Sequence, residues 1–140
     1  MRKIAIWGVV ALMMLALAAV PALAARPHFA PEGPTCALQT DQSIICSGGQ
    51  VSGLGNEPVT VFYVGQFQCL TKSGSNMPPG QARSVPITIA PSNGNISLPT
   101  ETLSSNCHGT QTPVAPTTVT LVIQNAQGQT VFSQPIQVTT

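Results

Sequence analysis

The stretch from Val59 to Cys69 constrains the fold more than any other part of the chain. Every second side chain points to one side of it, and that set is apolar or small: Val59, Val61, Tyr63, Gly65, Phe67 and Cys69. An alternation of period two indicates a β-strand with one face in the core. The opposite set, Thr60, Phe62, Val64, Gln66 and Gln68, begins largely apolar and ends with glutamines. We therefore expect one end of this strand to be covered on both faces.

Shorter segments of the same kind flank this strand. Residues 36–47 suggest a tight hairpin, residues 47–52 a strand with a bulge at Gly48-Gly49, and residues 85–89 and 95–98 two short strands. A final hairpin is expected over 117–140. No segment after residue 24 has an apolar period of 3.6. About seven short strands with frequent turn signals predict an all-β fold, namely an immunoglobulin-like antiparallel β-sandwich.

The first residues have the layout of a secretory signal peptide. A positive start, Arg2-Lys3, precedes an uncharged apolar run over 4–20, and Pro21 is followed by a small-x-small site ending at Ala24. We expect cleavage after Ala24, with an uncleaved anchor as the alternative. This divides the chain into a signal peptide (1–24), a proline-rich, flexible N-terminal arm (25–34) and one β-sandwich domain (35–140). The expected location is extracellular, with the periplasm as the alternative.

Four cysteines in an exported chain predict two disulfides, for which three pairings exist. If the first hairpin turns at Asp41, Cys36 lies directly across from Cys46, within disulfide reach. Cys69 then pairs with Cys107 by elimination. No Cys-x-x-Cys motif occurs, which argues against redox chemistry.

Charge is scarce in the expected mature chain. Its cations are Arg26, Lys72 and Arg83, and its acids are Glu32, Asp41, Glu57 and Glu101, a side-chain net charge of −1. A soluble domain usually has about a quarter of its residues charged. Nucleic acids and anionic lipids are bound by clustered Lys and Arg. We therefore expect neither nucleic-acid binding nor, once the signal is removed, membrane binding.

No arrangement for catalysis or cofactor binding can be drawn. Gly53-Leu54-Gly55 is followed by Glu-Pro and a strand, whereas a phosphate-binding loop must open a helix. Cys107-His108 and His28 lack the paired ligands of a zinc site. The acids are too scattered to assign an acid–base pair. We expect a protein that is not an enzyme and uses no metal or cofactor.

The run Val51-Ser-Gly-Leu-Gly-Asn56, the strand that follows, Cys69 and Pro78-Pro-Gly-Gln81 resemble a family of small, uncharacterised secreted bacterial β-rich proteins. The resemblance covers about Cys46 to Cys107. Relatives of this type often have Cys-Thr-Asn-Pro-Gly-Gly where this chain has Cys69-Leu-Thr-Lys-Ser-Gly74, so the loop differs. The resemblance implies an exported β-rich domain and supplies no catalytic residue.

The loop over 71–83 is the candidate contact surface, because binding residues favour loops on rigid scaffolds. Its candidate contact residues are Lys72, Asn76, Met77, Pro78, Pro79 and Arg83; the alternative is a plain crossover between strands. The sequence favours a non-enzymatic surface, matrix or adhesive module whose partner is a protein or a cell-surface polymer. Edge strands with few charges also suggest self-association by strand addition. The alternative function is a secreted inhibitor or ligand-binding module that presents this loop.

Overall fold

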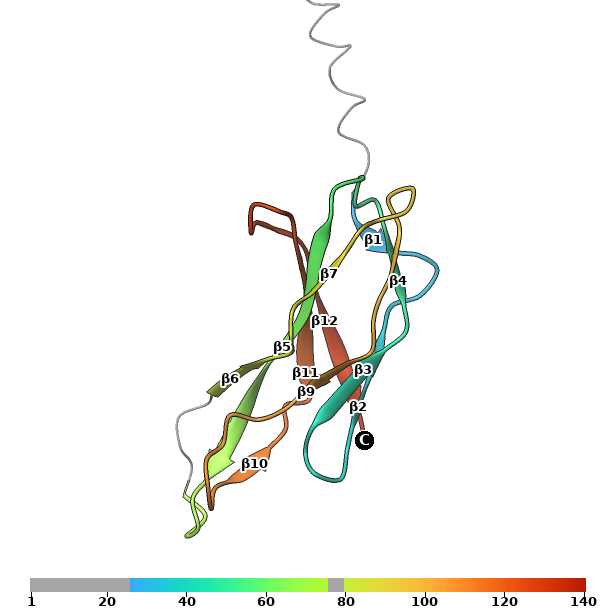
Figure 1. Cartoon of the computed structure of the whole chain (residues 1–140). Helices are drawn as coiled ribbons and strands as arrows, with labels where there is room; N and C mark the ends of the chain where they lie inside the picture. Colours follow the sequence, from blue (N-terminus) through green and yellow to red (C-terminus); the bar gives the residue numbers. More distant parts are fainter. Residues whose placement is uncertain (1–25, 76–79) are drawn as a thin grey trace, which may run out of the picture.

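The computed structural model describes residues 26–75 and 80–140, and every regular element in these residues is a β-strand (Figure 1). The strands are β1 (His28–Phe29), β2 (Thr35–Leu38), β3 (Ile44–Ser47), β4 (Gln50–Ser52), β5 (Val59–Leu70), β6 (Gly80–Arg83), β7 (Ile87–Ile89), β8 (Ile96–Ser97), β9 (Glu101–Leu103), β10 (Thr112–Val114), β11 (Thr118–Gln124) and β12 (Thr130–Thr139). These strands are more than the expected seven, because short breaks separate β3 from β4, β6 from β7 and β8 from β9.

The strands form two sheets arranged as a sandwich. The larger follows the order β10-β5-β11-β12-β2-β3-β9, with β6 and β7 also paired to β5, and the smaller is β1-β4-β8. The all-β sandwich with two disulfides is thus confirmed. One pair departs from the antiparallel pattern, since β12 runs parallel to β2 with Val138 opposite Cys36.

Strand β5 lies at the centre of this arrangement. All six residues expected to face inward, Gly65 included, are buried, and Tyr63 and Phe67 are fully enclosed. On the opposite face Phe62 is only 3% exposed. The Arg83 guanidinium covers its ring, 4.7 Å from the centroid, a cation–π contact. The prediction that one end of the strand is covered on both faces is therefore confirmed.

The predicted bulge at Gly48-Gly49 is wrong. The two glycines, with φ of 76° and 87°, separate β3 from β4, and these strands belong to different sheets. A Cβ on Gly49 would lie 2.6 Å from the Pro34 nitrogen, so only glycine allows the chain to cross here. The double glycine thus moves the chain from one sheet to the other.

The N-terminal arm, expected to be flexible, is ordered over residues 26–34. Strand β1 pairs with β4, so that Phe29 lies opposite Val51. The Phe29 ring packs edge-to-face on Phe132 at 5.1 Å, a preferred aromatic geometry. This packing was missed because one aromatic residue among three prolines carries no periodic signal.

The predicted signal peptide and its cleavage site after Ala24 lie outside the described residues. Within the described part of the chain, no helix is long and apolar enough to cross a membrane.

Both expected disulfides are present. Cys36 pairs in register with Cys46 across β2 and β3, as the turn at Asp41 predicts, and the two are bonded. The Asp41 carboxylate accepts hydrogen bonds from the Ser43 amide and hydroxyl, which lower the pKa of Asp41 and fix that turn. Cys69 is bonded to Cys107. Two disulfides indicate an oxidising compartment.

Candidate functional site

The second half of β5 belongs to a three-stranded extension of the larger sheet, which we call the distal arm. The distal arm consists of residues 65–70 in β5, the whole of β6 and β10, and the turn over 71–75. Residues 64–67 pair with β6 on one side, and residues 68–70 pair with β10 on the other. Figure 1 shows this part extending away from the end at which β1 and β4 lie. The twelve residues of β5 span about 40 Å, so the two ends of the molecule are well separated.

The arm joins the body at Gly65. A Cβ at this position would lie 2.9 Å from Leu103 Cδ2 and 3.2 Å from Val119 Cγ1. Any larger residue would therefore push against side chains of β9 and β11. Beyond Gly65, Phe67 is fully buried and Cys69 is 7% exposed. The arm thus has a small apolar interior continuous with the core.

The disulfide between Cys69 and Cys107 locks the far part of the arm. Their Cα atoms lie 5.5 Å apart, and Pro113 of β10 pairs opposite Cys69. Next to the disulfide, the Asn106 side-chain amide donates to the Gln81 carbonyl at 2.6 Å. The segment before β10 is therefore held to β5 covalently and to β6 by a hydrogen bond.

The tip of the arm is a compact turn over residues 71–75. The Thr71 amide donates to the Ser75 carbonyl at 2.9 Å, and the Ser75 amide donates to the Thr71 hydroxyl at 3.1 Å. Gly74, with φ of 85°, donates its amide to the Thr71 carbonyl. These bonds close the turn, and Lys72 and Ser73 are exposed to solvent. The turn presents its side chains from an ordered backbone.

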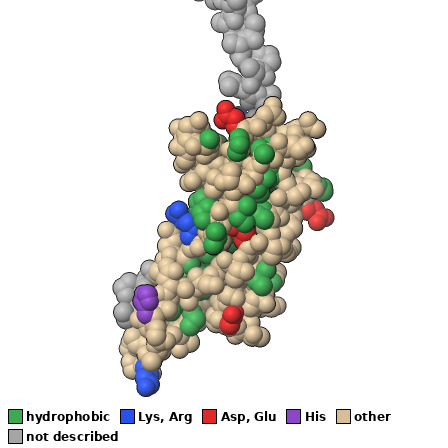
Figure 2. Space-filling view, in the orientation of Figure 1, with side chains coloured by type: hydrophobic (Ala, Val, Ile, Leu, Met, Phe, Trp, Pro, Cys, Tyr) green, Lys and Arg blue, Asp and Glu red, His purple; other side chains and the backbone are tan. Residues whose placement is uncertain are grey.

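A polar hollow of about 470 Å³ lies at the base of the arm. Uncharged hydrogen-bonding side chains line most of it: Gln66, Gln81, Thr117, Thr118 and Thr120. No ionisable side chain is among its lining residues. In the view of Figure 2, charged side chains are few and scattered over the surface. Such a surface suits hydrogen bonding to a neutral, polar partner.

The structure places the predicted contact residues at different points. Lys72 lies in the tip turn, whereas Arg83 pairs opposite Val64, six strand positions before the end of β5. The two cations are thus about 20 Å apart along the strand, and the Arg83 side chain is held on Phe62. Asn76, Met77, Pro78 and Pro79 lie outside the described residues.

A buried polar cluster escaped the sequence reasoning. The Ser84 hydroxyl accepts from the Tyr63 amide at 2.8 Å and donates to Glu101 Oε1 at 3.0 Å. Within the described residues, Glu101 Oε2 and the Tyr63 hydroxyl have no hydrogen-bond partner. Burial raises the pKa of Glu101, although the Ser84 hydrogen bond acts in the opposite direction. Burial, and then the charge of Glu101, raise the pKa of Tyr63.

This cluster does not make a catalytic centre. Glu101 is 5% exposed and Ser84 is 3% exposed, so a substrate has little access to either. The other three acids, Glu32, Asp41 and Glu57, are all exposed. Across the described ranges, no group of three or more metal-ligating side chains comes together.

Comparison with known proteins yields no assignment. No protein-family model matches the chain, and no curated protein matches it at a significant level.

Proposed function

We propose that this chain is a secreted, non-enzymatic interaction module that attaches to an extracellular protein or cell-surface polymer through the distal arm. One observation carries the proposal: the arm extends from the sandwich and is locked by a disulfide, and its exposed tip turn is closed by hydrogen bonds between Thr71, Gly74 and Ser75. Ordering a loop before it meets a partner reduces the entropy lost on binding. A plain crossover between strands has no need of this pre-organisation.

The character of the surface narrows the kind of partner. The hollow at the base of the arm is lined by glutamine and threonine without charge. A neutral polar polymer or a polar protein surface matches such groups, whereas a strongly charged partner would find no counter-charges there. The resemblance to exported β-rich bacterial proteins is consistent with a role outside the cell.

The test is binding to the producer's own cells and extracellular material. Fluorescently labelled protein is compared with the variant Lys72→Ala, with the variant Thr71→Val, which removes the hydroxyl that accepts from the Ser75 amide, and with Gln127→Ala as the matched control. Gln127 is exposed in the β11–β12 turn, at the opposite end of β5. Weaker binding of the two tip variants alone supports the proposal. Equal binding by all variants, or no binding by the parent protein, rejects it.

A second candidate function uses the same element. A disulfide-clamped exposed turn is also suited to enter the cleft of a secreted enzyme as an inhibitor. In that case the protein binds a soluble enzyme and reduces its activity, and it does not adhere to cells or extracellular polymer. Assays of the producer's secreted hydrolases with and without the protein distinguish the two functions.

A further inference from the structure

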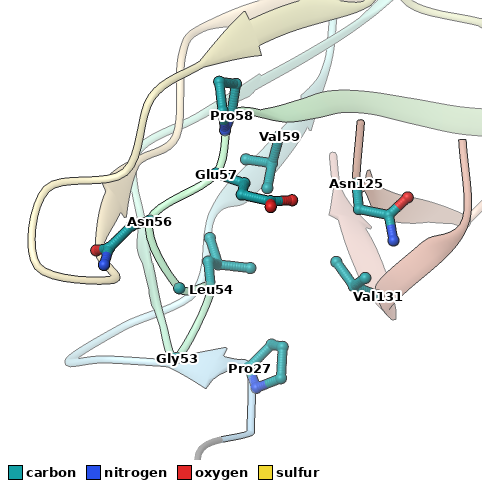
Figure 3. A pocket seen from close by; sticks show the side chains of 10 residues that line it. Pro27, Gly53, Leu54, Asn56, Glu57, Pro58, Val59, Asn125 and Val131 are labelled. Carbon is teal, nitrogen blue, oxygen red and sulfur yellow. The ribbon is translucent and has the colours of Figure 1, made fainter. Parts of the chain in front are cut away.

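A second hollow, of about 430 Å³, lies at the end of the molecule opposite the arm tip. Its walls are the turn over 53–58, the first residue of β5, Pro27 and the β11–β12 turn with Asn125 and Val131. Figure 3 shows Leu54 and the Glu57 carboxylate extending toward Asn125 and Val131, while Asn56 points away. This volume lies within the range of small-molecule sites.

The wall that contains the Gly-Leu-Gly-Asn motif is held on both sides. A Cβ on Gly53 would collide with the Arg26 carbonyl oxygen, so Gly53 lets the N-terminal segment close against the turn. On the other side, the Leu54 amide donates to the Gly94 carbonyl at 3.0 Å. The motif that fails as a phosphate loop therefore builds a fixed pocket wall.

The lining combines an apolar surface with a single charge. Pro27, Leu54, Pro58, Val59 and Val131 supply hydrocarbon, and Val131 remains 38% exposed. Among the described lining residues Glu57 is the only ionisable one, and no described residue forms a hydrogen bond or ion pair with its carboxylate. The Asn125 side chain is occupied within its own turn, because its oxygen accepts from the Gln127 and Gln129 amides. Glu57 is thus the free polar group of the pocket.

From this geometry we infer a binding site for a small organic cation with an apolar body, such as an alkylammonium ion. The hydrocarbon lies against Leu54, Val59 and Val131, and the ammonium group pairs with the Glu57 carboxylate. Charge complementarity selects a cation over a neutral or anionic ligand of the same shape. The inference does not depend on the proposed function of the arm, which lies at the other end of β5.

The test is NMR titration of uniformly ¹⁵N-labelled protein, exported through its own leader so that both disulfides form. The probes are hexylammonium, hexanol and hexanoate at equal ionic strength. Saturable shifts are expected in the amides of residues 54–57, 59, 125 and 131, at millimolar hexylammonium. Hexylammonium should bind up to about fivefold more tightly than hexanol, the range of an exposed ion pair. Each methylene added from butylammonium to hexylammonium should improve affinity about fourfold.

Variants separate the two contributions. Glu57→Gln should abolish the preference for hexylammonium over hexanol and leave hexanol binding unchanged, whereas Val131→Thr should weaken both. Glu32→Gln is the matched control, because Glu32 is an exposed carboxylate that lines a different hollow. Overturning results are shifts spread over the whole protein, no saturation, equal affinity for hexylammonium and hexanol, or a Glu57→Gln variant that keeps the preference.

Discussion

Removal of the disulfide between Cys69 and Cys107 tests whether the distal arm is part of the folded unit. The chain separation is 38 residues, for which the loop-entropy relation gives about 3.9 kcal/mol of lost stability. The second disulfide, with a separation of 10 residues, gives about 2.7 kcal/mol by the same relation. Its removal also disturbs the core, since Cys36 and Cys46 are 0% and 1% exposed.

The assay is urea unfolding of the Cys69→Ala/Cys107→Ala double variant, with hydrogen exchange as a second readout. We expect a loss of about 4 kcal/mol, and faster exchange at the amides of residues 68–70, 112 and 114, where β10 pairs with β5. Amides of β11 in the body of the sandwich, such as that of Leu121, should still exchange only through global unfolding of the variant. A loss below about 1 kcal/mol would contradict the reasoning, because the arm would then contribute little to the cooperative unit.

Three further predictions concern the interior and the turns. Because the pKa of Glu101 is raised in the fold, the native state keeps this proton to higher pH than the unfolded chain does. The contribution of Glu101 to stability is then complete below the ordinary value of 4.5 and is lost as pH rises through the raised pKa; Glu101→Gln should remove this contribution from the pH dependence in urea titrations across the range. Tyr63→Phe should change stability by less than about 1 kcal/mol, because the hydroxyl has no partner within the described residues; a loss above about 3 kcal/mol would reveal a hydrogen bond. Gly55→Ala should cost about 1–2 kcal/mol for its positive φ. Gly53→Ala should cost more, because its Cβ also meets the Arg26 carbonyl; equal thermal shifts for the two variants would refute this contact.

The features that the sequence predicts correctly are local ones. The register of the first hairpin follows from its turn, so Cys36 meets Cys46, and the second disulfide follows by elimination. The buried face of β5 follows from a simple alternation that its burial pattern repeats. Local periodicity and turn chemistry are sufficient for such features.

The features that were missed depend on contacts between distant segments. Gly48-Gly49 suggests a bulge in one strand, and only the packing of Gly49 against residues 33–34 shows why the chain changes sheets there. Glu101 alternates with the buried Leu103 in β9, but a strand of three residues is too short to give a periodic signal. A buried acid is expected only where a partner exists, and that partner, Ser84, is seventeen residues away.

The disulfide at Cys69 follows from the sequence by elimination. The arm itself does not follow from the sequence, because β6 and β10 are short and carry little apolar alternation. The pocket beside Gly53 joins four separate segments and has no local signal. Only the turn motif marked that region, and its role as a wall requires the fold.

The most direct test of the central claim is hydroxyl-radical footprinting of the exported protein, free and bound to extracellular material from its producer. The proposed function predicts protection of exposed side chains at the arm, namely Lys72, His108 and Val114, with Val131 at the opposite end unchanged. Protection confined to the opposite end, or no protection at the arm in the bound state, would contradict the proposal that the distal arm is the contact surface.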